Sequence, residues 1–201
     1  MRAKSWSFGV TAVLAIGVSG YALWAYGGGV QRVPVHPDMV KVFNEHRTLI
    51  TLHAVGASIA LLLGPLQFLD GWRARAPKVH RVLGYVYLVP GVAVGGVAGM
   101  LLAPRAFGGL VSHLGFGLLA CFWLVTGGMA VVAAKARRFE DHRRWMVRNY
   151  ALTFAAVTLR IYLPLGMAAG FRFEVVYPLI AWCCWVPNLI AVEWFGRRRS
   201  G

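Results

Sequence analysis

The stretch DHRRWMVRNYALTFAAVTLRIYLP, residues 141–164, carries a histidine near its start and an arginine near its end, and the rest of it is largely apolar. A helix of about 20 residues crosses the bilayer core, which is about 30 Å thick. His142 and Arg160 are separated by about five helical turns, so they share one face about 27 Å apart. Ionisable side chains at membrane depth are costly and usually face the protein interior. The stretch therefore predicts a membrane-spanning helix that lines a polar path on both sides of a bilayer.

The composition of the whole chain agrees with a membrane protein. Of its 201 residues, 58% are hydrophobic, and the mean hydropathy is +0.60, whereas soluble domains have roughly 45–50% apolar residues. Seven acidic residues stand against 21 basic ones, a formal net charge of +14. The basic residues flank apolar segments, so we expect them to set the orientation of the chain in the membrane. We do not expect a nucleic-acid partner. Cys121, Cys183 and Cys184 have neither disulfide nor zinc-site spacing.

Apolar runs between short polar or basic loops predict an all-α membrane protein, residues 1–201 forming a single polytopic domain in the lipid bilayer. We expect six transmembrane helices, of which segments two to five form a four-helix core. The predicted spans are residues 8–26, 46–69, 80–103, 108–134, 141–164 and 174–195. The basic start of the first span also fits a signal peptide, but its length favours an uncleaved span.

The distribution of basic residues predicts the orientation of these spans. Lysine and arginine are enriched in cytoplasmic loops. Here they gather at the N-terminus, in the loops at 70–79 and 135–140, and in the tail, which all lie on one side of a six-span chain. We therefore expect both termini in the cytoplasm.

Four of the six histidines fall one per helix on the second to fifth segments. His53 and His113 are expected near the outer ends, and His80 and His142 at the cytoplasmic ends. Antiparallel neighbours would then form two pairs, one in each leaflet. Such pairs can hold the irons of two b-type haems through their ring nitrogens. His46, on the same face as His53, is an alternative outer ligand.

Three of these histidines head stripes of small residues, spaced by three, four or seven positions. Such steps place each stripe on one helix face. The stripes comprise Gly56, Ala60 and Gly64 on the second segment, Gly84, Gly91 and Gly95 on the third, and Gly117, Ala120 and Gly127 on the fourth. Small residues either let helices approach closely or leave room for a flat ligand, and both interpretations stay open.

Arginines near the two predicted histidine pairs are candidates for binding haem propionates. Arg160 lies near the depth of the outer pair and would bind a carboxylate in a bidentate manner, or it reaches the outer headgroups as a snorkelling side chain. Arg73, Arg81 and Arg143 lie near the inner pair, where the alternative is that they only set topology. Other polar side chains on these helices are candidates for orienting the inner histidines or assisting Arg160. They are Gln67, Asp70, Asn149 and Tyr162.

The run GPLQFLDGWRARAPKVHRVLGYVY at 64–87, with the stretch at 141–164, resembles a bacterial family of predicted membrane proteins, domain of unknown function 2306. This resemblance covers about segments two to six and implies a multi-pass protein of a bacterial inner (plasma) membrane. The placement of the helix histidines is also similar to the cytochrome b-561 type of di-haem ferric reductases. That similarity implies that His53 and His113 bind an outer haem, and that His80 and His142 bind an inner one.

Three functional hypotheses follow. The first is a membrane cytochrome that passes electrons across the bilayer through two bis-histidine haems, a quinol- or ferric-reductase-like oxidoreductase with a quinol or redox protein as partner. The second is a small transporter or channel for a proton or solute, with a path along His142, Asn149, Thr153 and Arg160. The third is a structural subunit of a larger complex, and a homodimer is also compatible with the sequence.

Overall fold

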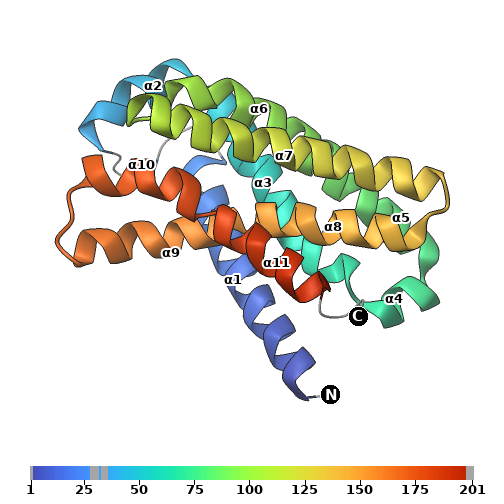
Figure 1. Cartoon of the computed structure of the whole chain (residues 1–201). Coiled ribbons are helices and arrows are strands. Elements are labelled where there is room, and N and C mark those ends of the chain that lie inside the picture. The colour runs from blue at the N-terminus through green and yellow to red at the C-terminus, as the bar shows by residue number, and fades with distance from the viewer. Residues whose placement is uncertain (1, 28–31, 33–35, 198–201) are drawn as a thin grey trace.

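A computed structural model of the chain describes residues 2–27, 32 and 36–197, without the side chains of residues 2–7, 70, 72, 73 and 197. This part of the chain is helical and contains no strand (Figure 1). Within it, six helical segments are long and apolar enough to cross a membrane. They are Phe8–Tyr26, Arg47–Gln67, Pro77–Arg105, Gly109–Lys135, Phe139–Ala168 and Phe173–Gly196. The predicted all-α fold with six transmembrane helices is confirmed.

Three of the spans each lie within a single uninterrupted α-helix. These are α1 (Arg2–Tyr26), α3 (Arg47–Gln67) and α7 (Gly109–Lys135). The third span is composite: α5 (Pro77–Val86) leads through a π-helical segment, η2 (Tyr87–Val94), into α6 (Gly95–Leu102) and a short 3₁₀ turn, η3 (Ala103–Arg105). Pro90 lies inside η2. Because proline has no backbone N–H and its ring clashes with the preceding turn, it disturbs the regular α-helical ladder at this point.

The fifth and sixth spans are also interrupted. The fifth consists of α8 (Phe139–Thr153) and α9 (Ala155–Ala168), so the single helix expected over 141–164 is divided at Phe154. The Thr153 hydroxyl donates to the backbone oxygen of Asn149 at 2.9 Å, and such a bond to the i−4 carbonyl often bends a helix. The sixth span consists of α10 (Phe173–Cys183) and α11 (Val186–Arg197).

Two regions expected to be loops contain short helices. The segment between the first two spans forms η1 (Pro37–Met39) and α2 (Val40–Glu45), and the basic connection after α3 forms α4 (Asp70–Arg75). These helices mark the two ends of the molecule (Figure 1). The α2 end also holds the turns after η3 and α9, and the α4 end holds the turn between α7 and α8. At the α2 end Gly108 begins the turn into α7 with a φ of +92°, which favours glycine.

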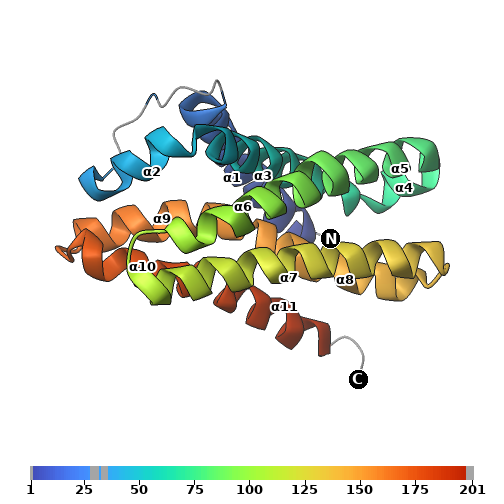
Figure 2. The same cartoon turned by 90° about the horizontal axis from the view of Figure 1, so that it is seen from above.

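Segments two to five form a closed ring, in agreement with the predicted four-helix core. Helix α3 packs on η2 and α6, α6 packs on α7, α7 packs on α8, and α8 returns to α3. The first span packs outside the ring on α3, and the last packs on α7, α8 and α9. In Figure 2, α1, α3 and α5 form one layer and α7, α8, α10 and α11 form the other, with α6 and α9 between them toward the α2 end.

The small-residue stripes of the second and third spans meet each other directly. A Cβ atom added to Gly56 would lie 2.7 Å from the Cα of Gly95, and one added to Gly91 would lie 3.2 Å from the Cβ of Ala60. At Gly64 the ring of Tyr150 occupies the same position. On this seam the small residues serve close helix packing, the first of the two interpretations above, and no room for a flat ligand is left between α3 and the third span at these positions.

Candidate functional site

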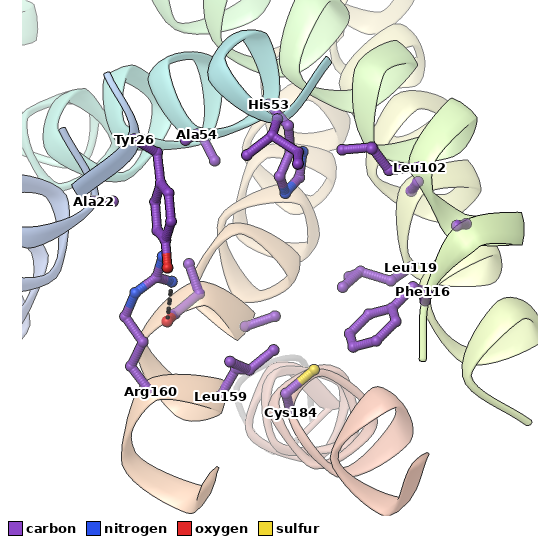
Figure 3. Close-up of a pocket in the computed structure, with 18 of the residues that line it drawn as sticks. Ala22, Tyr26, His53, Ala54, Leu102, Phe116, Leu119, Leu159, Arg160 and Cys184 are labelled. Atoms are coloured by element: carbon purple, nitrogen blue, oxygen red, sulfur yellow. Dashed lines mark hydrogen bonds between the residues drawn. The ribbon is translucent and has the colours of Figure 1, made fainter. Parts of the chain in front are cut away.

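A cavity of about 610 Å³ lies between the two layers in the α2 half of the bundle. Its walls come from α1, α3, α6, α7, α9 and α10, and most of the side chains are apolar, among them Ala57, Leu61, Phe116, Leu119 and Leu159. A few polar groups face this space, including Tyr26, His53 and Arg160 (Figure 3). A mostly apolar pocket of this size with a few converging polar groups is typical of small-molecule sites.

His53 contributes an imidazole ring to the wall formed by α3. Its Nδ1 lies 2.9 Å from the backbone oxygen of Gly95. Because a carbonyl only accepts, Nδ1 carries the proton, and in the neutral ring Nε2 is left with a free lone pair. No hydrogen bond to Nε2 is formed within the described part of the chain, and Figure 3 shows the ring directed into the cavity.

Arg160 lies on α9, on the opposite side of the cavity. Its Nη1 donates to the backbone oxygen of Ala156 at 3.0 Å, and its guanidinium carbon lies 6.0 Å from the ring centre of Tyr21. The hydroxyl of Tyr26 is beside the guanidinium in Figure 3. Among the described residues Arg160 forms no ion pair with a carboxylate. The cation therefore has donors left over at membrane depth.

A cluster of buried polar side chains lies in the middle of the bundle, next to the cavity. Trp123 donates from Nε1 to the hydroxyl of Thr153 at 2.8 Å, and the Tyr87 hydroxyl donates to Oδ1 of Asn149 at 2.6 Å. The Asn149 amide donates to the Trp123 backbone oxygen at 2.7 Å and to the Thr126 hydroxyl at 2.8 Å. We call these five residues the polar cluster. It joins the third, fourth and fifth spans.

The polar cluster bears on the path proposed from His142 to Arg160. Asn149 and Thr153, both on α8, are 0% and 4% exposed. The Thr153 hydroxyl bonds to the α8 backbone at Asn149, and between them the two side chains bond to residues of the third and fourth spans. These two side chains thus join helices within the bundle. Asn149 is also occupied here, so it does not orient the inner histidines as expected.

The outer histidine pair is not assembled. His113 does not line the cavity, and its Nε2 lies 3.0 Å from the backbone oxygen of Ala106. The helix register explains why: His53 packs on Gly99, while Gly117 of α7 faces Ala103, one turn further along the third span. Counting along antiparallel α7, His113 lies about eight residues, or roughly 12 Å, beyond the level of His53. In this structure the two histidines therefore lie at different levels of the bundle, and only His53 lines the cavity.

At the α4 end, His142 is half-buried and its Nδ1 lies 2.8 Å from the backbone oxygen of Ala130. His80 is also half-buried, near the start of α5. The cavity does not reach either histidine. Gln67, expected to orient them, is only 8% exposed, and its Nε2 has no hydrogen-bond partner among the described side chains. No group of three or more metal-binding side chains occurs within the described residues.

The remaining candidates lie away from the cavity. Arg81 and Arg143 are exposed, and the side chains of Arg73 and Asp70 lie outside the described part. His46 precedes α3 as its N-cap residue and does not line the cavity, so His53 is the better placed of the two. Tyr162, expected to assist Arg160, is 41% exposed on the far side of its helix.

Sequence reasoning missed the contribution of the first span. Tyr21 and Tyr26 of α1 line the cavity near Arg160, although α1 lies outside the four-helix core. A signal was present, because the small residues Ala15, Ser19 and Ala22 form a helix face that is almost fully buried. The Ser19 hydroxyl donates to the backbone oxygen of Ser58 on α3 at 3.4 Å. This packing places the two tyrosines at the cavity.

The chain belongs to the family of predicted membrane proteins DUF2306, whose family model matches residues 50–195. The matched region runs from α3 into α11 and contains His53, Arg160 and the polar cluster. No curated protein and no solved structure matches the chain. The family membership thus agrees with the membrane fold and leaves the activity to be argued from the site.

Proposed function

We propose that the chain is a single-domain, multi-pass membrane protein that binds a mostly apolar small molecule with a polar end. The observation that carries this proposal is the cavity of about 610 Å³ between the two helix layers, with His53 and Arg160 on its walls. Polar groups at membrane depth are costly unless they have a partner or a function. Both side chains keep bonding capacity directed into a mostly apolar space, which a ligand would use.

The arrangement of His53 favours a narrower candidate, a b-type haem in the cavity. A histidine that binds a metal almost always donates its other ring N–H to a carbonyl or carboxylate, and Nδ1 of His53 has such a partner in Gly95. His53 would then hold the iron through Nε2, and Arg160 would bind a propionate. A haem would supply one-electron transfer, with a quinol or a redox protein as the partner of such a cytochrome.

The second haem of the cytochrome hypothesis has less support. His142 has the same Nδ1–carbonyl contact, so its Nε2 would suit an iron, with His80 as the other ligand and Arg81 and Arg143 near the propionates. His113 does not fit the outer haem, because its own Nε2 is bound to Ala106 and its depth differs from that of His53. We therefore propose His53 without His113 as the ligand from this chain in the cavity.

Absorption spectra of the purified protein test the haem candidate. Protein from haem-replete cells should show reduced-minus-oxidised bands that are lost in His53→Ala and retained in His113→Ala. Loss of the bands in both variants would instead favour the bis-histidine pair. A colourless wild-type protein would reject the haem and leave the broader binding function.

Native mass spectrometry tests that broader function. The wild-type protein, purified in a mild uncharged detergent, should retain a small molecule in part of the population. Ala156→Trp fills the cavity from α9, since Ala156 lines it, and should reduce the retained fraction several-fold. Gly128→Trp is the matched control, because nothing lies within 4 Å of a Cβ at that position. Equal retention by wild type and Ala156→Trp would contradict binding in the cavity.

We also propose that the α4 end faces the cytoplasm of a bacterial cell, with the protein in the inner membrane. Exposed basic side chains gather at this end and include Arg75, Lys78, Arg81, Arg137, Arg138, Arg143 and Arg144. The positive-inside rule supports this direction. A periplasm-dependent phosphatase fused after residue 197 should be inactive, and the same enzyme inserted after Gly170 should be active. The reverse pattern would overturn the orientation.

A further inference from the structure

We infer that the polar end of the cavity's ligand is a carboxylate and that Arg160 binds it. This inference rests on the proposed binding function and names the chemical class of its ligand. It would hold equally for a fatty acid and for a haem, because each carries a carboxylate on a mostly apolar body. The experiment below separates the two sources.

The first step is the charge of the site. A guanidinium stays protonated and offers five N–H donors, of which one is accounted for by the Ala156 carbonyl. Most acidic side chains pair elsewhere: Asp38 with His36, Glu45 with Lys41, Asp141 with Arg138, Glu174 with Arg172 and Glu193 with Arg148. The other two, Asp70 and Glu140, begin α4 and α8 at the opposite end of the bundle. The protein therefore supplies no described counter-ion to Arg160.

The second step is the direction of the side chain. Arg160 lies eight residues, or about 12 Å, before the end of α9 at the α2 end. A snorkelling arginine would extend toward that end. Instead, the guanidinium bonds to Ala156, one turn nearer the middle of the bundle, and lies beside the Tyr26 hydroxyl at the cavity (Figure 3). The cation is thus directed to the cavity and away from the headgroups.

The third step is the number of charges that the site can neutralise. Arg105 also lines the cavity, but it is exposed, so that water screens its charge, whereas Arg160 is partly buried among apolar side chains. One guanidinium balances one negative charge, and its planar fork matches the two oxygens of a carboxylate. A phosphate monoester would bring more than one negative charge into a space of low dielectric constant. A monoanionic carboxylate, with Tyr26 as an additional donor, satisfies both charge and geometry.

Binding of paired acids and esters tests the inference. We would titrate wild-type protein in an uncharged detergent with cis-parinaric acid and its methyl ester, and with haem and haem dimethyl ester, and follow fluorescence or absorbance. At least one acid should bind ten-fold or more tightly than its ester. A preference for parinaric acid over its ester would identify a fatty acid as the ligand. A preference for haem over its ester would identify a haem.

Variants assign the effect to Arg160. Arg160→Met should remove the preference for the acid and leave ester binding within about two-fold of wild type, while Arg160→Lys should keep part of the preference. Arg172→Met is the matched control, since Arg172 pairs with Glu174 outside the cavity lining, and it should behave as wild type. His53→Ala should weaken haem binding but not parinaric acid binding, which separates the metal ligand from the carboxylate ligand.

The outcomes distinguish failure of the inference from failure of the function beneath it. Equal binding of acid and ester by the wild-type protein would overturn the carboxylate and keep the cavity as a binding site. An acid preference that persists in a folded Arg160→Met would overturn the role of Arg160. If none of the four probes binds, and no small molecule is retained on purification, both the inference and the proposed function fail. Should Arg160→Met not fold, the comparison of acid with ester on wild type still decides the ligand class.

Discussion

The polar cluster and the cavity lie next to each other, but the polar side chains of the two regions differ in how fully they are hydrogen-bonded. In the polar cluster, Tyr87, Asn149 and Thr153 bond to one another and to neighbouring helices, and all three are almost fully buried. In the cavity, His53 and Arg160 each bond to one backbone oxygen and keep further capacity toward an open space. Unused bonding capacity, more than polarity or depth, therefore distinguishes a candidate binding residue from a structural one.

The largest effect on stability is expected in the polar cluster. Asn149→Leu removes three buried hydrogen bonds, which join Asn149 to the Tyr87 hydroxyl, the Trp123 carbonyl and the Thr126 hydroxyl, and should lower the free energy of unfolding by about 2–3 kcal/mol. Unfolding in mixed detergent micelles measures this change. The control is Asn44→Leu, at an exposed position where the side chain accepts a hydrogen bond from Arg47. Equal stability of the two variants would mean that the cluster does not hold the helices together.

A second prediction concerns the contact between α3 and the third span, two segments that both contribute walls to the cavity. Gly56→Ala places a methyl group 2.7 Å from the Cα of Gly95, so the helices must separate, at about 1–3 kcal/mol. Gly128→Ala meets nothing within 4 Å and should be neutral or slightly stabilising, because alanine favours helix. Thermal unfolding in detergent compares them. Similar melting temperatures would indicate that the seam is looser than this structure shows.

For a substitution in the cavity we expect no loss of the free energy of unfolding, and instead a small gain or no change. Arg160→Met removes a cation that has no carboxylate partner among the described residues, and should leave the ligand-free protein equally stable or about 1 kcal/mol more stable. The same unfolding assay applies. A loss of stability as large as that of Asn149→Leu would place Arg160 with the structural residues and erase the contrast between the two regions.

The smallest effect is expected at an ion pair remote from both regions. Glu193→Gln weakens the contact of Glu193 with Arg148, which joins α11 to α8 and is partly exposed. Such pairs contribute less than about 1 kcal/mol and are screened by salt. Unfolding at low and high ionic strength should show a small difference that disappears at high salt. A salt-independent loss would show that Glu193 acts through its hydrogen bonds to Arg148 and not through a screened charge interaction.

Part of the site could be predicted from the sequence. His53 and Arg160 were identified because ionisable groups within apolar helices are rare, and both line the cavity. The pairing of His53 with His113 could not be predicted correctly, because it depends on how far α7 is shifted along the third span. Tyr21 and Tyr26, which the first span contributes to the cavity wall, could not be predicted, because a helix outside the core is not expected to reach a central cavity.

Length and hydropathy along the chain are enough to predict the six helical spans, because both are local properties and a bilayer admits few other structures. They also restrict the polar positions at membrane depth to a short set. What these positions do depends on how the helices pack, since the same small-residue spacing serves either helix packing or a ligand. A shift of one helical turn, about 5.4 Å, decides whether two side chains meet. That shift is fixed by contacts such as Gly56 on Gly95 and by the bonds of Asn149, which join residues far apart in the chain.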